Sequence, residues 1–143
     1  MSSIGGKSRE PGEGHGYRFW VVPDGYLASS PGVPPGPSGY FSHESVCILN
    51  DGDRPAGCKL HLYFENRDPV LGIPFEVGAR RSLHLRLDQV KDHAGQLLPR
   101  DLPYSLTVES DSNIVVQHSR LDCTQENLAL FTTMAFPAPD PRD

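Results

Sequence analysis

Four polar side chains follow directly after an apolar run in the segment NIVVQHSRLD (113–122). They are Gln117, His118, Arg120 and Asp122. Arginine presents a planar fork of donors that suits hydroxyl, carboxylate or phosphate oxygens, and histidine and glutamine can donate or accept. Polar groups beside a buried run are themselves partly buried and need partners. The segment therefore predicts a ligand-binding site.

Two further polar groups are candidates for the same site. In FSHESVCILN (41–50), His43 and Glu44 precede the apolar run. In GARRSLH, Arg80, Arg81 and His84 form the second group. If these segments are neighbouring strands, their polar residues would surround one cleft, with the arginine group as its third wall.

Side-chain alternation decides which of these residues face the same way. In an extended strand, His118, Arg120 and Asp122 share a face with Val116, whereas Gln117 points to the opposite side. This predicts a core that opens at one rim into a polar cleft. A solvent-facing row of ion pairs, contributing about 0–1 kcal/mol per pair, is the alternative. A subunit interface is a second alternative, and the sequence leaves all three open.

The same residues give little support for catalysis. No GxSxG nucleophile elbow is present. A metal site could use His43, Glu44 and His118, but the compact HxH…E…H spacing of jelly-roll metalloenzymes is missing. The prediction is a non-catalytic protein without cofactor or metal, and a metal-dependent sugar-processing enzyme is the minority alternative.

Short segments rich in β-branched and aromatic residues must position these groups. The predicted strands lie at 17–26, 40–50, 58–66, 104–111, 113–122 and 127–136, with two more inside 70–90. Turns rich in Pro, Gly, Asn and Asp separate them. We expect an all-β single domain, an antiparallel β-sandwich or jelly-roll-like barrel, over 17–136. Residues 1–16 are expected to be a disordered leader and 137–143 a Pro-rich tail.

Composition narrows the partners and the compartment. The 143 residues carry a net charge of -5, which disfavours a phosphate backbone, so DNA binding is not expected. The three cysteines have no CxxC spacing, so neither a zinc site nor a redox motif is indicated. With no apolar signal core and no apolar run of membrane length, a soluble, cytoplasmic protein is expected.

Four blocks of the chain resemble the sensory rhodopsin transducer family. They are FWVVPDGYLASS, FSHESVCILN, GARRSLH and IVVQHSRLDCTQENLAL, in this order between about Tyr17 and Phe136. The resemblance implies a small β-sandwich that assembles as a homo-oligomer, expected to be a tetramer. It also implies a pocket for a small molecule such as a sugar, and a membrane receptor such as a sensory rhodopsin as a partner.

When the family's polar positions are carried over to this sequence, they coincide with the candidates already selected. They also add Gln125 and Asn127 from TQEN. The predicted ligand-binding set is His43, Glu44, Arg80, Arg81, His84, Gln117, His118, Arg120, Asp122, Gln125 and Asn127. The predicted function is a non-catalytic binding or signalling module for a sugar-like or anionic molecule. A protein-interaction transducer of a membrane photoreceptor is the leading alternative.

Overall fold

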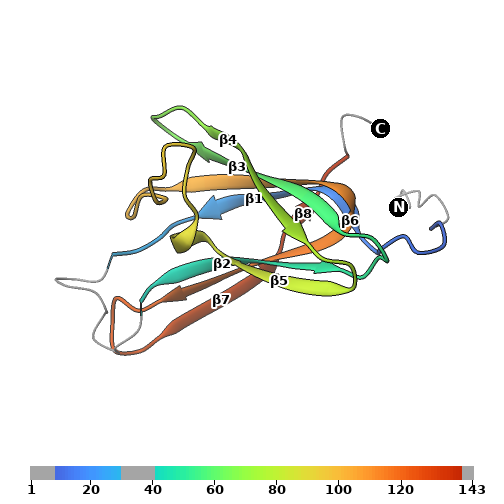
Figure 1. The fold of residues 1–143 in the computed structure, drawn as a ribbon. Helices are drawn as coiled ribbons and strands as arrows, with labels where there is room; N and C mark the ends of the chain where they lie inside the picture. Colours follow the sequence, from blue (N-terminus) through green and yellow to red (C-terminus); the bar gives the residue numbers. More distant parts are fainter. Residues whose placement is uncertain (1–8, 30–40, 140–143) are drawn as a thin grey trace.

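The structure is a computed structural model that describes residues 9–29 and 41–139, and strands make up almost all of its regular structure (Figure 1). The elements are β1 Tyr17–Gly25, β2 His43–Asn50, β3 Ala56–Phe64, β4 Val70–Val77, β5 Arg81–Arg86, the 3-10 helix η1 Leu87–Gln89, β6 Tyr104–Asp122, β7 Ala129–Met134 and β8 Phe136–Pro137. All strand pairs are antiparallel. The predicted all-β antiparallel fold is therefore confirmed.

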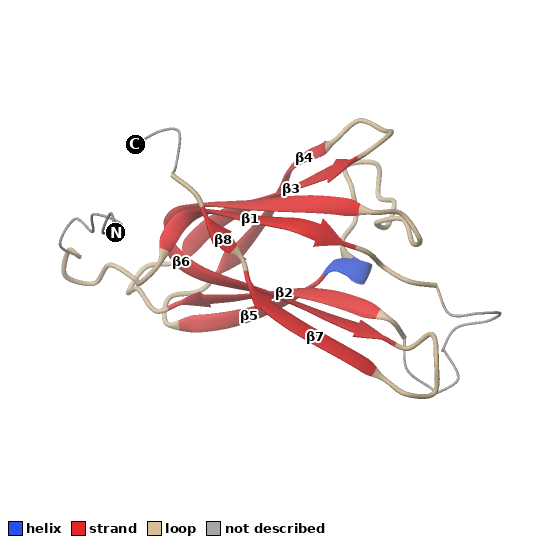
Figure 2. Cartoon of the chain, turned by 180° about the vertical axis from the view of Figure 1, so that it is seen from behind, coloured by secondary structure: helices blue, strands red, loops and turns tan. Residues whose placement is uncertain are grey.

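Strand β6 belongs to both layers of the molecule. Its first half pairs with β1 and β3, giving the order β4-β3-β6-β1-β8. Its second half pairs with β2 and β7, and β5 completes that layer beside β2. Figures 1 and 2 show the two layers facing each other, with β7 at the lower edge of the second layer. One open sheet thus folds over into a sandwich.

The two strands predicted at 104–111 and 113–122 are one strand of 19 residues, so that part of the prediction is wrong. Asp111-Ser112-Asn113 favours a turn by residue type, but it contains neither Gly nor Pro, and the backbone stays extended while it bends. The bend appears in the register with β1, where Phe19 pairs with Glu109 and Tyr17 with Ile114.

Alternating apolar residues from both layers fill the space between them. In β3, Leu60 and Leu62 are buried, and in β6 so are Leu106 and Val108. Trp20 joins this core, where its indole nitrogen donates to the carbonyl of Ile114 at 3.1 Å. The second layer contributes Val46, Ile48 and Val116. Side chains in these strands thus alternate between the interior and the outer surface.

The described part of the predicted leader packs against the domain. The His15 backbone N–H donates to Asp51 Oδ1 at 2.7 Å, and Asp53 N–H donates to the Gly12 carbonyl at 2.9 Å. Gly16 has φ +100°, and a Cβ there would lie 1.9 Å from the Ile114 carbonyl oxygen, so only glycine fits. Residues 1–8, 30–40 and 140–143 lie outside the described residues, and the domain boundaries stay a prediction.

Candidate functional site

The antiparallel pairing of β2 with β6 brings the two polar strand ends together. Glu44 pairs with Arg120, and Val46 pairs with His118. Because residues alternate across both strands, Glu44, His118 and Arg120 point to the same side as the core residue Val46. The predicted common face of His118 and Arg120 with the core is therefore confirmed.

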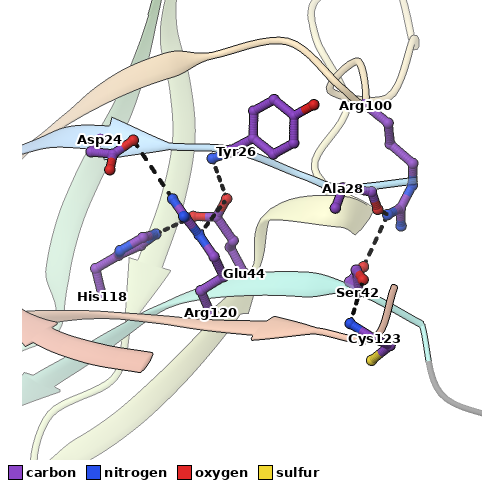
Figure 3. A network of polar contacts seen from close by, with 9 residues as sticks. All are labelled: Asp24, Tyr26, Ala28, Ser42, Glu44, Arg100, His118, Arg120 and Cys123. Carbon is purple, nitrogen blue, oxygen red and sulfur yellow. Dashed lines mark hydrogen bonds and ion pairs between the residues drawn. The ribbon is translucent and has the colours of Figure 1, made fainter. Parts of the chain in front are cut away.

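The carboxylate of Glu44 is the centre of this cluster, and its side chain is fully buried (Figure 3). It accepts hydrogen bonds from His118 Nε2 and from the backbone N–H of Tyr26. Arg120 Nε lies 3.6 Å from Glu44 Oε1. An isolated buried carboxylate would be strongly destabilising, so these three partners explain why Glu44 can occupy this position.

His118 is also fully buried, and its two ring nitrogens differ in their hydrogen bonding. Nε2 carries the proton that reaches Glu44, because a carboxylate can only accept. Nδ1 is buried and has no hydrogen-bond partner among residues 9–29 and 41–139. Because neither His118 nor Glu44 reaches the surface, they can act on a ligand only through their neighbours, such as Arg120.

Arg120 connects this buried charge to the rim of the sandwich. Its side chain is 26% exposed, and Nη2 lies 3.7 Å from Asp24 Oδ1, on a side chain that is 87% exposed. Asp122 follows on the same strand face, and hydrogen bonds from Thr124 lower the pKa of the Asp122 carboxyl group. The rim therefore presents one guanidinium between carboxylates.

Tyr104 packs beneath the rim against Gly25. A Cβ at Gly25 would lie 2.3 Å from Tyr104 Cζ, so the ring requires glycine at this position. Burial, and then the negative charge of Glu44, raise the pKa of Tyr104, so the phenol stays neutral near pH 7. Its hydroxyl has no hydrogen-bond partner within the described part of the chain.

Arg100 ties together two segments that approach the site from different parts of the chain. Arg100 Nη1 donates to the carbonyls of Ala28 at 2.8 Å and Ser42 at 3.0 Å (Figure 3). The Ser42 hydroxyl in turn accepts from Cys123 N–H at 2.8 Å. These contacts join the segment after Tyr26 to the segment before Glu44, which are the two segments that meet at the Glu44 carboxylate.

Asp101 binds Ser29, the residue after Ala28, and has a strained backbone conformation. Its φ is 59°, in the left-handed region that disfavours most side chains. Its carboxylate accepts from Ser29 N–H at 2.9 Å and from the Ser29 hydroxyl. These hydrogen bonds lower the pKa of Asp101. No spacing or motif marks Arg100 or Asp101 in the sequence, so sequence reasoning missed both.

The predicted third wall is not part of this cluster. Because β5 runs antiparallel to β2, Arg81 at the start of β5 pairs with Asn50 at the far end of β2 from Glu44. Arg80 precedes that strand and is exposed, as is Arg81. His84 is exposed and pairs with Cys47. The expectation that this group closes one cleft with His118 is therefore corrected.

The remaining predicted residues surround the cluster without joining it. His43 is adjacent to Glu44 but on the opposite strand face, and its Nδ1 lies 3.0 Å from the Phe41 carbonyl. Gln117 also faces outward and donates to Thr132 Oγ1 at 2.6 Å. Gln125 and Asn127 are exposed in the turn between β6 and β7. Their role in binding stays a prediction.

Surface hollows and possible metal ligands bear on what this cluster could hold. Three hollows of about 590, 130 and 40 Å³ are lined by residues other than Glu44, His118 and Arg120. Across residues 9–29 and 41–139, no three His, Cys, Asp or Glu side chains converge to hold a metal ion. The same residues form no helix that is long and apolar enough to cross a membrane.

Comparison with known proteins gives a consistent family. The family model described as Anabaena sensory rhodopsin transducer matches residues 15–137. A solved structure from Thermotoga maritima, described as Thermotoga maritima 1070, is 36% identical with a TM-score of 0.73, covering 86% of this chain and 96% of that one. The solved Anabaena sensory rhodopsin transducer is 35% identical with a TM-score of 0.66, covering 76% of this chain and 91% of that one. None of the curated proteins compared matches.

Proposed function

This chain belongs to the Anabaena sensory rhodopsin transducer family, and we propose that it is a non-catalytic binding and signalling module whose small-molecule site is the rim around Arg120. The observation that carries the proposal is the buried Glu44 carboxylate, which lies 3.6 Å behind Arg120 Nε while the guanidinium reaches the surface and Asp24. Two flanking carboxylates favour one orientation of the guanidinium before a ligand binds, which lowers the side-chain entropy lost on binding.

The charges at the rim favour an uncharged, sugar-like ligand over a sugar acid. Asp24 and Asp122 flank the single guanidinium of Arg120, and Glu44 already neutralises part of its charge. An anionic ligand would meet these carboxylates, whereas hydroxyl groups can donate to the carboxylates and accept from the arginine. Tyr26, half-buried beside the rim, could pack against a sugar ring.

A thermal-shift screen of the full chain tests this proposal. The panel consists of neutral sugars and polyols, each paired with its sugar acid. A ligand at 100 times its Kd stabilises the folded state by about 2.7 kcal/mol, so a true ligand raises Tm clearly. We expect neutral compounds to give the larger shift, and Arg120→Lys and Asp24→Asn to reduce it. Arg67→Lys, distant on the β3–β4 loop, is the matched control.

Two results would count against the ligand site. Absence of any shift across the panel removes the small-molecule function. A shift that Arg120→Lys and Asp24→Asn leave intact moves the ligand to another surface.

A membrane receptor and further copies of the chain are the proposed protein partners. The Anabaena relative is described as a sensory rhodopsin transducer. By analogy, the second candidate function is a cytoplasmic transducer that contacts a membrane receptor and assembles as a homo-tetramer. Co-purification of a tagged chain with membrane proteins from its own host tests the receptor. If no membrane protein co-purifies with the tagged chain while a sugar raises its Tm, the ligand site is supported and the receptor is not.

A further inference from the structure

The hollow of about 130 Å³ lies between the end of the β3–β4 hairpin and the segment 90–99. It reaches down to the core, because Leu62, Val90 and Leu98 line it and all three are buried. Val70 on β4 forms another part of its wall. A small concave site with apolar walls and few polar groups is typical of small-molecule binding.

The walls of this hollow are fixed before any ligand binds. Within the segment 90–99, the Leu98 N–H donates to the Val90 carbonyl at 3.3 Å. His93 Nε2 donates to the Leu71 carbonyl at 2.6 Å, which ties the segment to β4. Because hydrogen bonds hold both sides in place, a ligand that enters the hollow orders little of the chain, and less conformational entropy is lost on binding.

One guanidinium stands beside the apolar walls. Arg67 lies over the ring of Phe64, 5.6 Å from the ring centroid, and both residues line the hollow. None of the ion pairs formed by the described residues involves Arg67. The other charged residue that lines the hollow is Asp92, whose Oδ1 accepts from the N–H groups of Ala94 and Gln96 in its own loop. Arg67 is therefore the charged group available to a ligand.

We propose that this hollow binds a small carboxylic acid with a single aromatic ring, of which benzoate is the simplest probe. An engineered apolar cavity of about 150 Å³ in another protein holds benzene, so one ring matches the size of this hollow. Phe64 favours an aromatic ring over an aliphatic chain, because aromatic pairs stabilise each other beyond the area that they bury. The planar fork of Arg67 suits a carboxylate and repels an ammonium group.

This site is separate from the rim around Arg120 and does not depend on it. None of the residues that line the hollow belongs to the cluster of Glu44, His118 and Arg120. The ligand classes also differ, because the rim offers carboxylates and one arginine to hydroxyl groups, whereas the hollow offers apolar walls to a ring. The two sites can therefore be tested with different compounds.

Titration of the isotope-labelled full chain with benzoate, benzyl alcohol and benzylamine, followed by NMR chemical shifts, tests the ligand class. A hydrogen bond to a charged group should make the Kd of benzoate about tenfold lower than that of benzyl alcohol. Benzylamine should bind most weakly. Arg67→Gln should remove the tenfold preference for benzoate. Arg54→Gln, an exposed arginine on the β2–β3 turn, is the matched control and should keep it.

Two variants of the wall test the location. Val70→Phe fills the hollow and should abolish binding of benzoate, whereas Leu71→Phe, at the next residue and outside the lining, should retain it. Leu97 lines the hollow and is 55% exposed, so Leu97→Asp should fold normally while its carboxylate weakens benzoate binding. Circular dichroism checks that each variant has a native spectrum, and Leu97→Asp decides the location if Val70→Phe does not fold.

Three results would overturn the proposal. If benzoate does not bind the unmodified chain, the hollow is not a ligand site. If benzoate binding survives the wall variants that fold, the ligand lies on another surface. If benzylamine binds as tightly as benzoate, the carboxylate class is wrong. A chain that raises its Tm with a sugar but does not bind benzoate loses this site alone, and the reverse result removes only the rim function.

Discussion

Replacing Glu44 with methionine should destabilise the protein more than any other single change at the site. Methionine fills a similar volume but cannot accept a hydrogen bond. His118 Nε2 and the Tyr26 N–H would then be buried donors without their acceptor. Each such orphaned donor costs about 1–3 kcal/mol. Arg120 would lose a partner at 3.6 Å but keep Asp24 and contact with water, so its loss adds about 0–1 kcal/mol.

The sum predicts that Glu44→Met lowers the free energy of unfolding by about 2–7 kcal/mol, a range that includes the roughly 3–5 kcal/mol typical of breaking a buried ion pair. That is a large part of the 5–15 kcal/mol, roughly, that stabilises an ordinary domain. His118→Leu leaves Glu44 with Tyr26 and Arg120, so we expect a smaller loss of about 1–3 kcal/mol. Because both changes remove the same contact, the double variant should cost about 1–3 kcal/mol less than the sum.

Urea unfolding of the three variants, followed by circular dichroism, measures these values. Glu76→Met is the matched control, since Glu76 also lies on a strand but is exposed, and its cost should stay within about 0.5 kcal/mol. The slope of the unfolding free energy against urea must remain constant for the comparison to hold. If Glu44→Met costs no more than Glu76→Met, or if the double variant is additive, the buried cluster does not exist as described.

Three further predictions follow from the surroundings of the site. Gly25→Ala should cost about 1–3 kcal/mol by forcing Tyr104 from its place, and less in a Tyr104→Leu background; equal costs in both backgrounds would contradict the clash. Burial raises the pKa of Cys58 to about 11, so iodoacetamide at pH 8 should modify half-buried Cys47 before Cys58, as peptide mapping can measure; early labelling of Cys58 would show that β3 opens readily. Because Ser29 lowers the pKa of Asp101, the carboxylate stabilises the fold above its ordinary pKa of about 4, and this contribution is lost as pH falls through the lower folded pKa. The stability difference between the unmodified chain and Asp101→Asn should therefore be largest near pH 7 and shrink under acid, and a difference that is constant with pH would contradict the assignment.

The sequence predicted what depends on local pattern. Alternation in the second half of β6 placed His118 on the same face as the core residue Val116, and both are buried in the structure. Glu44 and His118 were both selected, but their contact spans 74 residues and depends on a register that no local pattern contains. The wrong placement of the Arg80-Arg81 pair has the same cause, because the direction of β5 beside β2 decides which end it reaches.

Contacts made by backbone atoms were beyond sequence reasoning. Tyr26 contributes to the site through its N–H, which every residue except proline carries. Arg100 acts through the carbonyls of Ala28 and Ser42, so their side-chain types give no signal. Strand β6 was divided in two because Asp, Ser and Asn are frequent in turns, although in this chain they continue an extended backbone.

The continuity of β6 limits how the two layers can move relative to each other. Because a single strand is hydrogen-bonded into both layers, the layers have no flexible joint at β6 and cannot slide past each other without bending that strand. Arg120 therefore lies on the same strand that is hydrogen-bonded to β1 and β3 in the other layer.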